Sequence, residues 1–172
     1  MQKTEIKASL FNKVLVIIIS LLVVTAIAVA AALAIPGENT MFAGKRPTNL
    51  GIQLGQLAPC PNSPNCVSSF SQDNEHKIEP LAYTSASEDA ISNLKKAILS
   101  LPRTQIITET NNYLYAEFAS ALMGFVDDVE FLLDAETKVI HVRSASRLGE
   151  SDLGVNRKRI ETLRSKLNQI ST

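Results

Sequence analysis

Two neighbouring segments of the chain, residues 124–134 and 138–146, contain strand-forming residues and are separated by a short polar turn. The register of such a hairpin decides which side chains share a face, because a slip of one residue turns every side chain over. The register that pairs Ala135 with Lys138 sets the large apolar residues on one face: Leu133 opposite Ile140, Phe131 opposite Val142, and Val129 opposite Ser144. The sequence therefore predicts an antiparallel hairpin with one apolar face.

The same register distributes the acidic residues of the first strand between the two faces. Glu130 falls opposite Arg143 on the other face, as an opposite-charge pair. Asp127 falls beside Ser146 on the apolar face, where a carboxylate needs a partner because burying it alone is costly. Asp127 and Asp128 point to opposite faces, so they cannot act together on one substrate atom, which argues against glycosidase chemistry.

Two segments with helical spacing accompany further strands. The first begins at Ser87, a candidate N-cap, ends before Pro102, and carries Ile91, Leu94, Ile98 and Leu101. The second begins near Ser151 and Asp152 and carries Leu153, Ile160, Leu163, Leu167 and Ile170 on one stripe. Residues 78–83 fit a short strand, and 104–108 and 113–119 are rich in strand-forming residues. This order, β-α-β-β-β-β-α, predicts an α+β domain with a single antiparallel sheet of about five strands and both helices on one face.

Residues 14–35 are apolar throughout except for Ser20 and Thr25. About 20 such residues cross a bilayer core as a helix. Three lysines and one glutamate precede the run, which predicts a cytoplasmic N-terminus and export of the rest of the chain. The length of the run favours an uncleaved transmembrane anchor, whereas small residues near its end offer cleavage sites for a signal peptide.

These features divide the chain into four parts. Residues 1–13 form the cytoplasmic segment, and residues 14–35 form the anchor or signal peptide. An extended linker and cysteine loop follows at 36–65, and the α+β domain occupies 66–172.

Cys60 and Cys66 lie in a proline-rich loop, and two cysteines in an exported domain most simply form one disulfide. Closing this short loop would stabilise the fold by about 2 kcal/mol. A redox-active pair and a zinc site are the alternatives. Five residues separate the cysteines, unlike the two of thioredoxin-like motifs, and neither His76 nor His141 falls at zinc-finger spacing. We therefore expect no metal and no cofactor.

The charged residues fall into two blocks of opposite sign. The chain has 17 basic and 17 acidic residues, which argues against nucleic-acid binding. Residues 103–136 contain one base and the acids Glu109, Glu117, Asp127, Asp128, Glu130, Asp134 and Glu136. Residues 143–166 contain only three acids and the bases Arg143, Arg147, Arg157, Lys158, Arg159, Arg164 and Lys166. We expect many of these charges to pair in space.

The basic block also contains a candidate ligand site. Arginines that converge at a helix N-terminus can bind an anion. The candidate residues are Arg143, Ser146, Arg147, Asn156, Arg157 and Asp127. In this hypothesis the arginines contact the ligand, and Asp127 and Glu130 orient them. The alternative is a structural ion-pair network in which the acids already neutralise the arginines. A hydrolase built on His141 with Ser144 or Ser146 is disfavoured, because the register places the histidine on the opposite face.

Several motifs resemble a known family when taken together. They are the run Arg-Pro-Thr-Asn-Leu-Gly at 46–51, the cysteine loop through 69, Gly-Phe-Val-Asp-Asp-Val-Glu-Phe at 124–131, and the segments 143–147 and 152–161. Together they resemble the DUF1499 family over most of the chain after about Lys45. The resemblance implies a domain of unknown function, found in bacteria and in plastid-bearing eukaryotes, and brings no catalytic residues.

These observations favour a binding role over catalysis. We expect a membrane-anchored domain on the extracytoplasmic side, in a periplasm or thylakoid lumen, or a secreted domain if the N-terminal segment is cleaved. Its expected partner is the membrane, through the N-terminal helix, together with a small anionic or amphiphilic ligand or a protein. The alternatives are an enzyme whose site lies at Asp127, Arg143, Arg147 and Arg157, and a structural subunit of an envelope or thylakoid assembly.

Overall fold

The computed structural model describes residues 13–27, 29 and 42–170. The chain divides into two units, Met1–Ile35 and Pro36–Thr172. In the first unit, residues 13–27 are helical. No helix within the described ranges combines the length and apolar character needed to cross a bilayer. Residues 28 and 30–35 of the predicted span, and 1–12 of the segment before it, lie outside the described residues.

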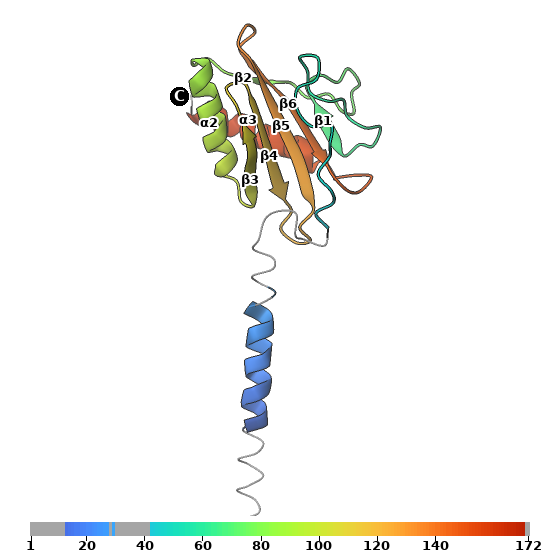
Figure 1. Ribbon diagram of the computed structural model, residues 1–172, viewed down its shortest axis with the longest axis vertical. Coiled ribbons are helices and arrows are strands. Elements are labelled where there is room, and N and C mark those ends of the chain that lie inside the picture. Colours follow the sequence, from blue (N-terminus) through green and yellow to red (C-terminus); the bar gives the residue numbers. More distant parts are fainter. Residues whose placement is uncertain (1–12, 28, 30–41, 171–172) are drawn as a thin grey trace, which may run out of the picture. The chain divides into compact units, whose positions relative to one another are not determined.

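The second unit is built on one antiparallel sheet (Figure 1). Its elements are β1 (Cys66–Ser68), β2 (Leu81–Ala82), α2 (Ser87–Leu99), β3 (Thr104–Glu109), β4 (Tyr113–Ala119), β5 (Val126–Asp134), β6 (Val139–Ser146) and α3 (Val155–Ile170). The strand order is β1-β6-β5-β4-β3, and β2 also pairs with β6. The α+β class and the single antiparallel sheet are confirmed. The additional strand is β1, which extends the cysteine loop and is too short to show an alternating pattern.

The predicted hairpin is confirmed in its register. Leu133 pairs with Ile140, Phe131 with Val142, Val129 with Ser144, Glu130 with Arg143, and Asp127 with Ser146. The periodicity of apolar residues was sufficient to align these strands, because only one alignment places all the large apolar pairs together.

The starts of both helices differ from the prediction. The N-cap of α2 is Ala86 rather than Ser87, and no side chain caps this end. Helix α3 begins at Val155, because the preceding Leu153 and Gly154 adopt positive φ angles of 54° and 79°. The Asp152 carboxylate accepts hydrogen bonds from the N–H groups of Gly154 and Asn156, at 3.0 and 2.6 Å. Asp152 therefore closes a turn before the helix, and Leu153 is exposed rather than part of the buried stripe.

The main hydrophobic core lies between the two helices and one face of the sheet, which we call the apolar face. It includes Leu94 and Ile98 of α2, Ile160 and Leu163 of α3, and Phe131 at the centre of β5, all fully buried. Both helices therefore cover the same face, as the sequence predicts.

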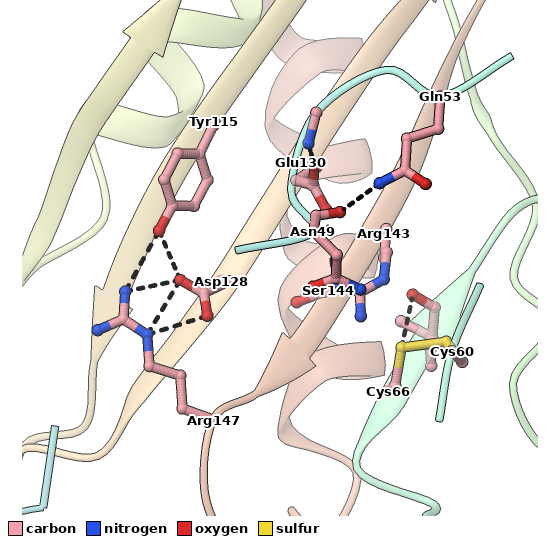
Figure 2. Close-up of polar contacts among 12 residues, drawn as sticks. Asn49, Gln53, Cys60, Cys66, Tyr115, Asp128, Glu130, Arg143, Ser144 and Arg147 are labelled. Atoms are coloured by element: carbon pink, nitrogen blue, oxygen red, sulfur yellow. Dashed lines mark hydrogen bonds and ion pairs between the residues drawn. A yellow bond between two sulfur atoms is a disulfide. The ribbon is translucent and has the colours of Figure 1, made fainter. Parts of the chain in front are cut away.

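The opposite face of the sheet is covered by residues 42–57, which we call the covering segment. Leu57 and the partly buried Leu50 of this segment pack in a small cluster with Tyr113 and Tyr115 of β4. We call this whole face the polar face, because charged side chains form most of the rest of it. Figure 2 shows the covering segment, with Asn49 and Gln53, on the side of the sheet away from α3.

Candidate functional site

A buried arginine organises one half of the polar face. The side chain of Arg147 is 1% exposed, and its Nε donates to both carboxylate oxygens of Asp128, at 3.1 and 2.9 Å. Its Nη2 donates to Asp128 Oδ1 (2.7 Å), to the Tyr115 hydroxyl (3.2 Å) and to Glu117. Arg46 of the covering segment adds an ion pair to Glu117, at 2.6 Å. The Arg147 guanidinium therefore joins β4 and β5, and Figure 2 shows its contacts with Tyr115 and Asp128. The covering segment joins this group through the contact of Arg46 with Glu117.

A second group surrounds Glu130, whose side chain is fully buried. Its Oε1 accepts hydrogen bonds from the Gly51 N–H, at 2.6 Å, and from the Tyr113 hydroxyl, at 2.8 Å. Its Oε2 accepts a longer bond of 3.4 Å from Arg143, the partner that the register predicts. Glu130 thus fastens the backbone of the covering segment to the sheet.

Burial and hydrogen bonding act in opposite directions on the carboxyl of Glu117. Burial raises its pKa, but hydrogen bonds from Tyr115, Arg46 and Arg147 outweigh that effect and hold the pKa below its usual value. Burial, together with the hydrogen bond to Asp128, raises the pKa of Tyr115 well above its usual value. Glu117 is therefore a charged acceptor on this face, and Tyr115 remains a neutral donor.

Asp127 lies in a separate cluster on the apolar face. It accepts from the Ser146 hydroxyl, at 2.6 Å, and forms an ion pair with Arg159 of α3. Asn156, also on α3, is fully buried and donates to the Ser146 hydroxyl, at 3.0 Å. Asp127 thus has the partner it was expected to need, and that partner is Arg159.

The six predicted ligand residues do not converge on one site. Arg143 and Arg147 lie on the polar face, whereas Asp127, Ser146 and Asn156 lie on the apolar face at the start of α3. Arg157 donates to the backbone carbonyls of Glu75 and Lys77, at 2.9 and 2.8 Å. Sequence reasoning missed the roles of Arg46, Tyr115, Glu117 and Arg159. Strand alternation could have placed Tyr115 and Glu117 on the face of Asp128, but no local pattern points to Arg46.

Within the described part of the chain, three buried side-chain atoms have no hydrogen-bond partner: Glu117 Oε2, Arg143 Nε and Arg147 Nη1. All three belong to the polar face. Native proteins pair nearly all buried polar atoms, so each of these three has capacity for a further contact. Arg143 is the least engaged arginine of the three on this face, because its one described carboxylate contact is at 3.4 Å.

A groove of about 680 Å³ lies beside the cysteine loop. The predicted disulfide is confirmed, with 2.08 Å between the sulfurs of Cys60 and Cys66. One wall of the groove is the loop 56–62, including Leu57 and Cys60, and the other includes Ser68, Phe70 and the acids Asp73 and Glu75. The disulfide and the neighbouring prolines restrict the loop wall, so the groove has one rigid side.

His141 lies at the edge of a neighbouring hollow of about 390 Å³. Its Nδ1 is 3.1 Å from the Ser69 hydroxyl, and its ring stacks on Phe70, with 4.3 Å between the ring centroids. Burial lowers the pKa of His141. The Ser69 hydroxyl also accepts from the Val142 N–H, at 3.0 Å, which holds it against β6. Among the described residues, no group of three His, Cys, Asp or Glu side chains is placed to hold a metal ion.

Comparison with known proteins identifies a family for the second unit of the chain. No match was found among curated proteins. The model of the DUF1499 family, described as a protein of unknown function, matches residues 56–167. This range includes every strand, α2 and all but the last three residues of α3, and it begins within the covering segment. The family that the sequence motifs indicate is therefore confirmed, and the chain belongs to the DUF1499 family.

Proposed function

We propose that this protein is a non-enzymatic binding domain, held at the extracytoplasmic surface of a membrane by residues 14–35, that binds an amphiphile with a single acidic head group. The N-terminal part of the proposal rests on the apolar run and on the three lysines that precede it. The binding part rests on the groove beside the cysteine loop.

The main observation in support of binding is the position of Arg143 relative to this groove. Ser68 is among the groove-lining residues, and it is the direct cross-strand partner of Arg143. Directly opposite residues of an antiparallel pair project from the same face, so the side chain of Arg143 shares the face of Ser68, although Arg143 itself is not one of the residues that line the groove. Its Nε is buried and has no partner among the described residues. A carboxylate or comparable acceptor that enters the groove would satisfy this donor.

The other walls define the remainder of the ligand. Leu57, Phe70 and the prolines offer apolar contact for a hydrocarbon portion. Asp73 and Glu75 stand at the groove and disfavour a polyanion, since like charges repel. The other arginines of the predicted ligand site are already engaged by carboxylates or carbonyls. A singly charged amphiphile fits this set better than phosphate-rich ligands do.

Titration of the isotope-labelled protein with two matched probes tests the binding proposal. Decanoate carries an acidic head group, and decyltrimethylammonium carries a cationic one on a chain of the same length. We expect decanoate to shift the amide resonances of residues 56–62 and 68–76, and to lose most of this effect in Phe70→Ala. Shifts with the cation alone, or with neither probe, would contradict the proposal and favour a purely structural role for the polar face.

A reporter fused after Thr172 tests the topology separately. Alkaline phosphatase is active only after export, and a cytoplasmic fluorescent protein serves as the complementary fusion. We expect activity from the phosphatase fusion. The opposite pattern would rule out the extracytoplasmic location while leaving the groove unaffected.

A further inference from the structure

The two ends of the sheet carry turns of opposite character. At one end, the turn after β3 is Thr110-Asn111-Asn112, and the turn between β5 and β6 includes Glu136 and Lys138. At the other end, residues 120–125 join β4 to β5 with the sequence Ser-Ala-Leu-Met-Gly-Phe, which contains no charged residue. Surface turns are normally built from polar residues and glycine, so this apolar turn calls for a physical explanation.

The apolar turn projects its largest side chains outward. Leu122 is 83% exposed, and Met123 beside it is also exposed. The loop between β6 and α3 lies at the same end, because the Arg147 N–H bonds to the Val126 carbonyl, at 3.2 Å. This loop exposes Leu148 and Leu153, the latter at 93%. Single exposed leucines are ordinary, but four large apolar side chains on two loops at one end form a set.

The chain enters the domain at this same end. The ring of Phe42 lies against that of Phe125 at the base of the apolar turn, with 5.3 Å between their centroids. The Cα of Gly44 adjoins Arg147 and Leu148, because a Cβ placed there would come within 2.9 and 3.0 Å of their side chains. The first residues of the covering segment therefore run between the apolar turn and the loop 147–154, which combines Leu148 and Leu153 with the acids Glu150 and Asp152.

Chain length connects this end to a lipid surface. Phe42 follows closely after Ile35, the last residue of the apolar run. If that run spans a bilayer, as proposed above, the about seven residue steps between them reach at most about 25 Å even when fully extended. The end of the domain that contains Phe42 is then confined near the membrane, whereas the polar turns mark the opposite end of the sheet.

We propose that the loops at 120–125 and 147–154 form a lipid-contact surface, with Leu122, Met123, Leu148 and Leu153 inserted at the level of the head groups. Side chains in such a position penetrate about 5–10 Å into the boundary between head groups and acyl chains. The contact fixes the domain against the bilayer and leaves the polar turns at the far end exposed to solvent. This inference rests on the proposed membrane attachment and is independent of the ligand proposed for the groove.

The absence of tryptophan from the chain makes a direct test possible. Leu122→Trp places a single fluorescent reporter on the proposed surface. Leu54→Trp is the matched control, because Leu54 is also a highly exposed leucine in a tight turn. Its neighbours Ile52 and Gly55 line the hollow formed with Asn112 and Asp134, at the polar end of the sheet.

Both full-length variants are reconstituted into phosphatidylcholine vesicles, with or without bromine atoms near the carbonyl end of the acyl chains. We expect brominated lipid to reduce the emission of the Leu122→Trp variant by about half or more, given the depth of interfacial side chains. The emission of the Leu54→Trp variant should remain nearly unchanged. Circular dichroism and vesicle flotation confirm that each variant is folded and attached.

The outcomes separate the two proposals. Equal, weak quenching of both variants in protein that floats with the vesicles would overturn the lipid-contact surface and leave the membrane attachment standing. Emission from the Leu122→Trp variant that depends on protein concentration but not on bromine would indicate a second copy of the chain on this surface, which also overturns it. Protein that fails to float would overturn the attachment and this inference together.

Discussion

The two faces of the sheet are covered in different ways. The apolar face is covered by α2 and α3, whose buried leucines and isoleucines form one continuous core with the strands. The polar face is covered by the covering segment, which has little regular structure. Two contacts fasten this segment to the sheet: the Gly51 N–H donates to Glu130, and Arg46 forms an ion pair with Glu117. Burial of apolar area is non-directional, whereas each buried charge requires a specific partner. The helix side can thus adjust its packing, whereas loss of one fully buried charge on the polar face, such as Arg147, leaves its partners buried without compensation.

The difference also separates stability from binding capacity. The large side chains of the apolar core pack against one another, and such contacts stabilise the fold without presenting polar groups to a ligand. The polar face has nearly balanced charges, yet three of its buried atoms have no partner among the described residues. In the function proposed above, this network holds the fold together, and the ligand binds at its least engaged arginine, Arg143.

The largest expected effect comes from removing the most buried charge. Arg147→Ala leaves Asp128 and Glu117 buried without their main cationic partner, so the free energy of unfolding should fall by about 3–5 kcal/mol. Urea denaturation of the full chain in mild detergent measures this loss. Arg157→Ala is the control, because the described hydrogen bonds of its guanidinium go to backbone carbonyls near the surface, and it should cost about 1 kcal/mol or less. Equal losses would show that the polar face contributes no more than a surface contact.

On the apolar face, a substitution that conserves side-chain volume should lower the free energy of unfolding less than a truncation does. Leu163→Ala opens a cavity beneath α3 and should cost about 2–5 kcal/mol, whereas Leu163→Met should cost less than about 1.5 kcal/mol. The corresponding conservative change on the polar face is Arg147→Lys, which removes the planar guanidinium that contacts two acids. It should lower the free energy of unfolding more than Leu163→Met does. Comparable losses for Leu163→Met and Arg147→Lys, measured by thermal unfolding, would remove the distinction between the faces.

The same distinction explains what could be predicted from the sequence. The hairpin and the buried residues of both helices follow from periodicity, which is local information. The polar face depends on contacts between residues 71 and 79 positions apart, Arg46 with Glu117 and Gly51 with Glu130. The covering segment has no period that reveals which face it contacts. Charge balance predicted that the two blocks would pair, but it did not identify Arg159 as the partner of Asp127.

The disulfide should contribute less to the free energy of unfolding than Arg147 does, and more than the ion pair of Arg46. It closes a loop with a sequence separation of 6 residues, so replacing both cysteines should lower the free energy of unfolding by about 2 kcal/mol. The double variant combines Cys60→Ser with Cys66→Ala, because Cys66 is buried and alanine leaves no unpaired hydroxyl there. Because Cys60 lines the groove, the double variant should also weaken the decanoate shifts at 56–62. Unchanged shifts would show that the loop wall is rigid without its crosslink.

Acid should destabilise the polar face selectively. The pKa of Glu117 is held below its usual value in the folded protein. Its stabilisation is therefore fully present above the pKa of the unfolded chain, and it is lost as the pH falls through the lower folded-state value. Glu117→Gln should flatten the acid limb of the stability profile at pH values below the ordinary pKa of a glutamate carboxyl. An unchanged acid limb, measured by urea unfolding at each pH, would assign the acid sensitivity to other carboxyls.

The smallest expected effect is local opening of the covering segment. The side chain of Arg46 is 37% exposed, and solvent screening limits its ion pair with Glu117 to about 1 kcal/mol or less. Arg46→Ala should barely change global stability, yet it removes a polar fastening of the covering segment, the ion pair with Glu117. Hydrogen exchange at the Gly51 amide, which bonds to Glu130, should become faster, while the Phe131 amide within β5 remains protected. Lys45→Ala, at the adjacent exposed position, is the matched control and should change neither amide. If Arg46→Ala also leaves Gly51 unchanged, the segment is held by Glu130 and the packing of Leu50 and Leu57, and the ion pair with Glu117 serves only to neutralise that carboxylate.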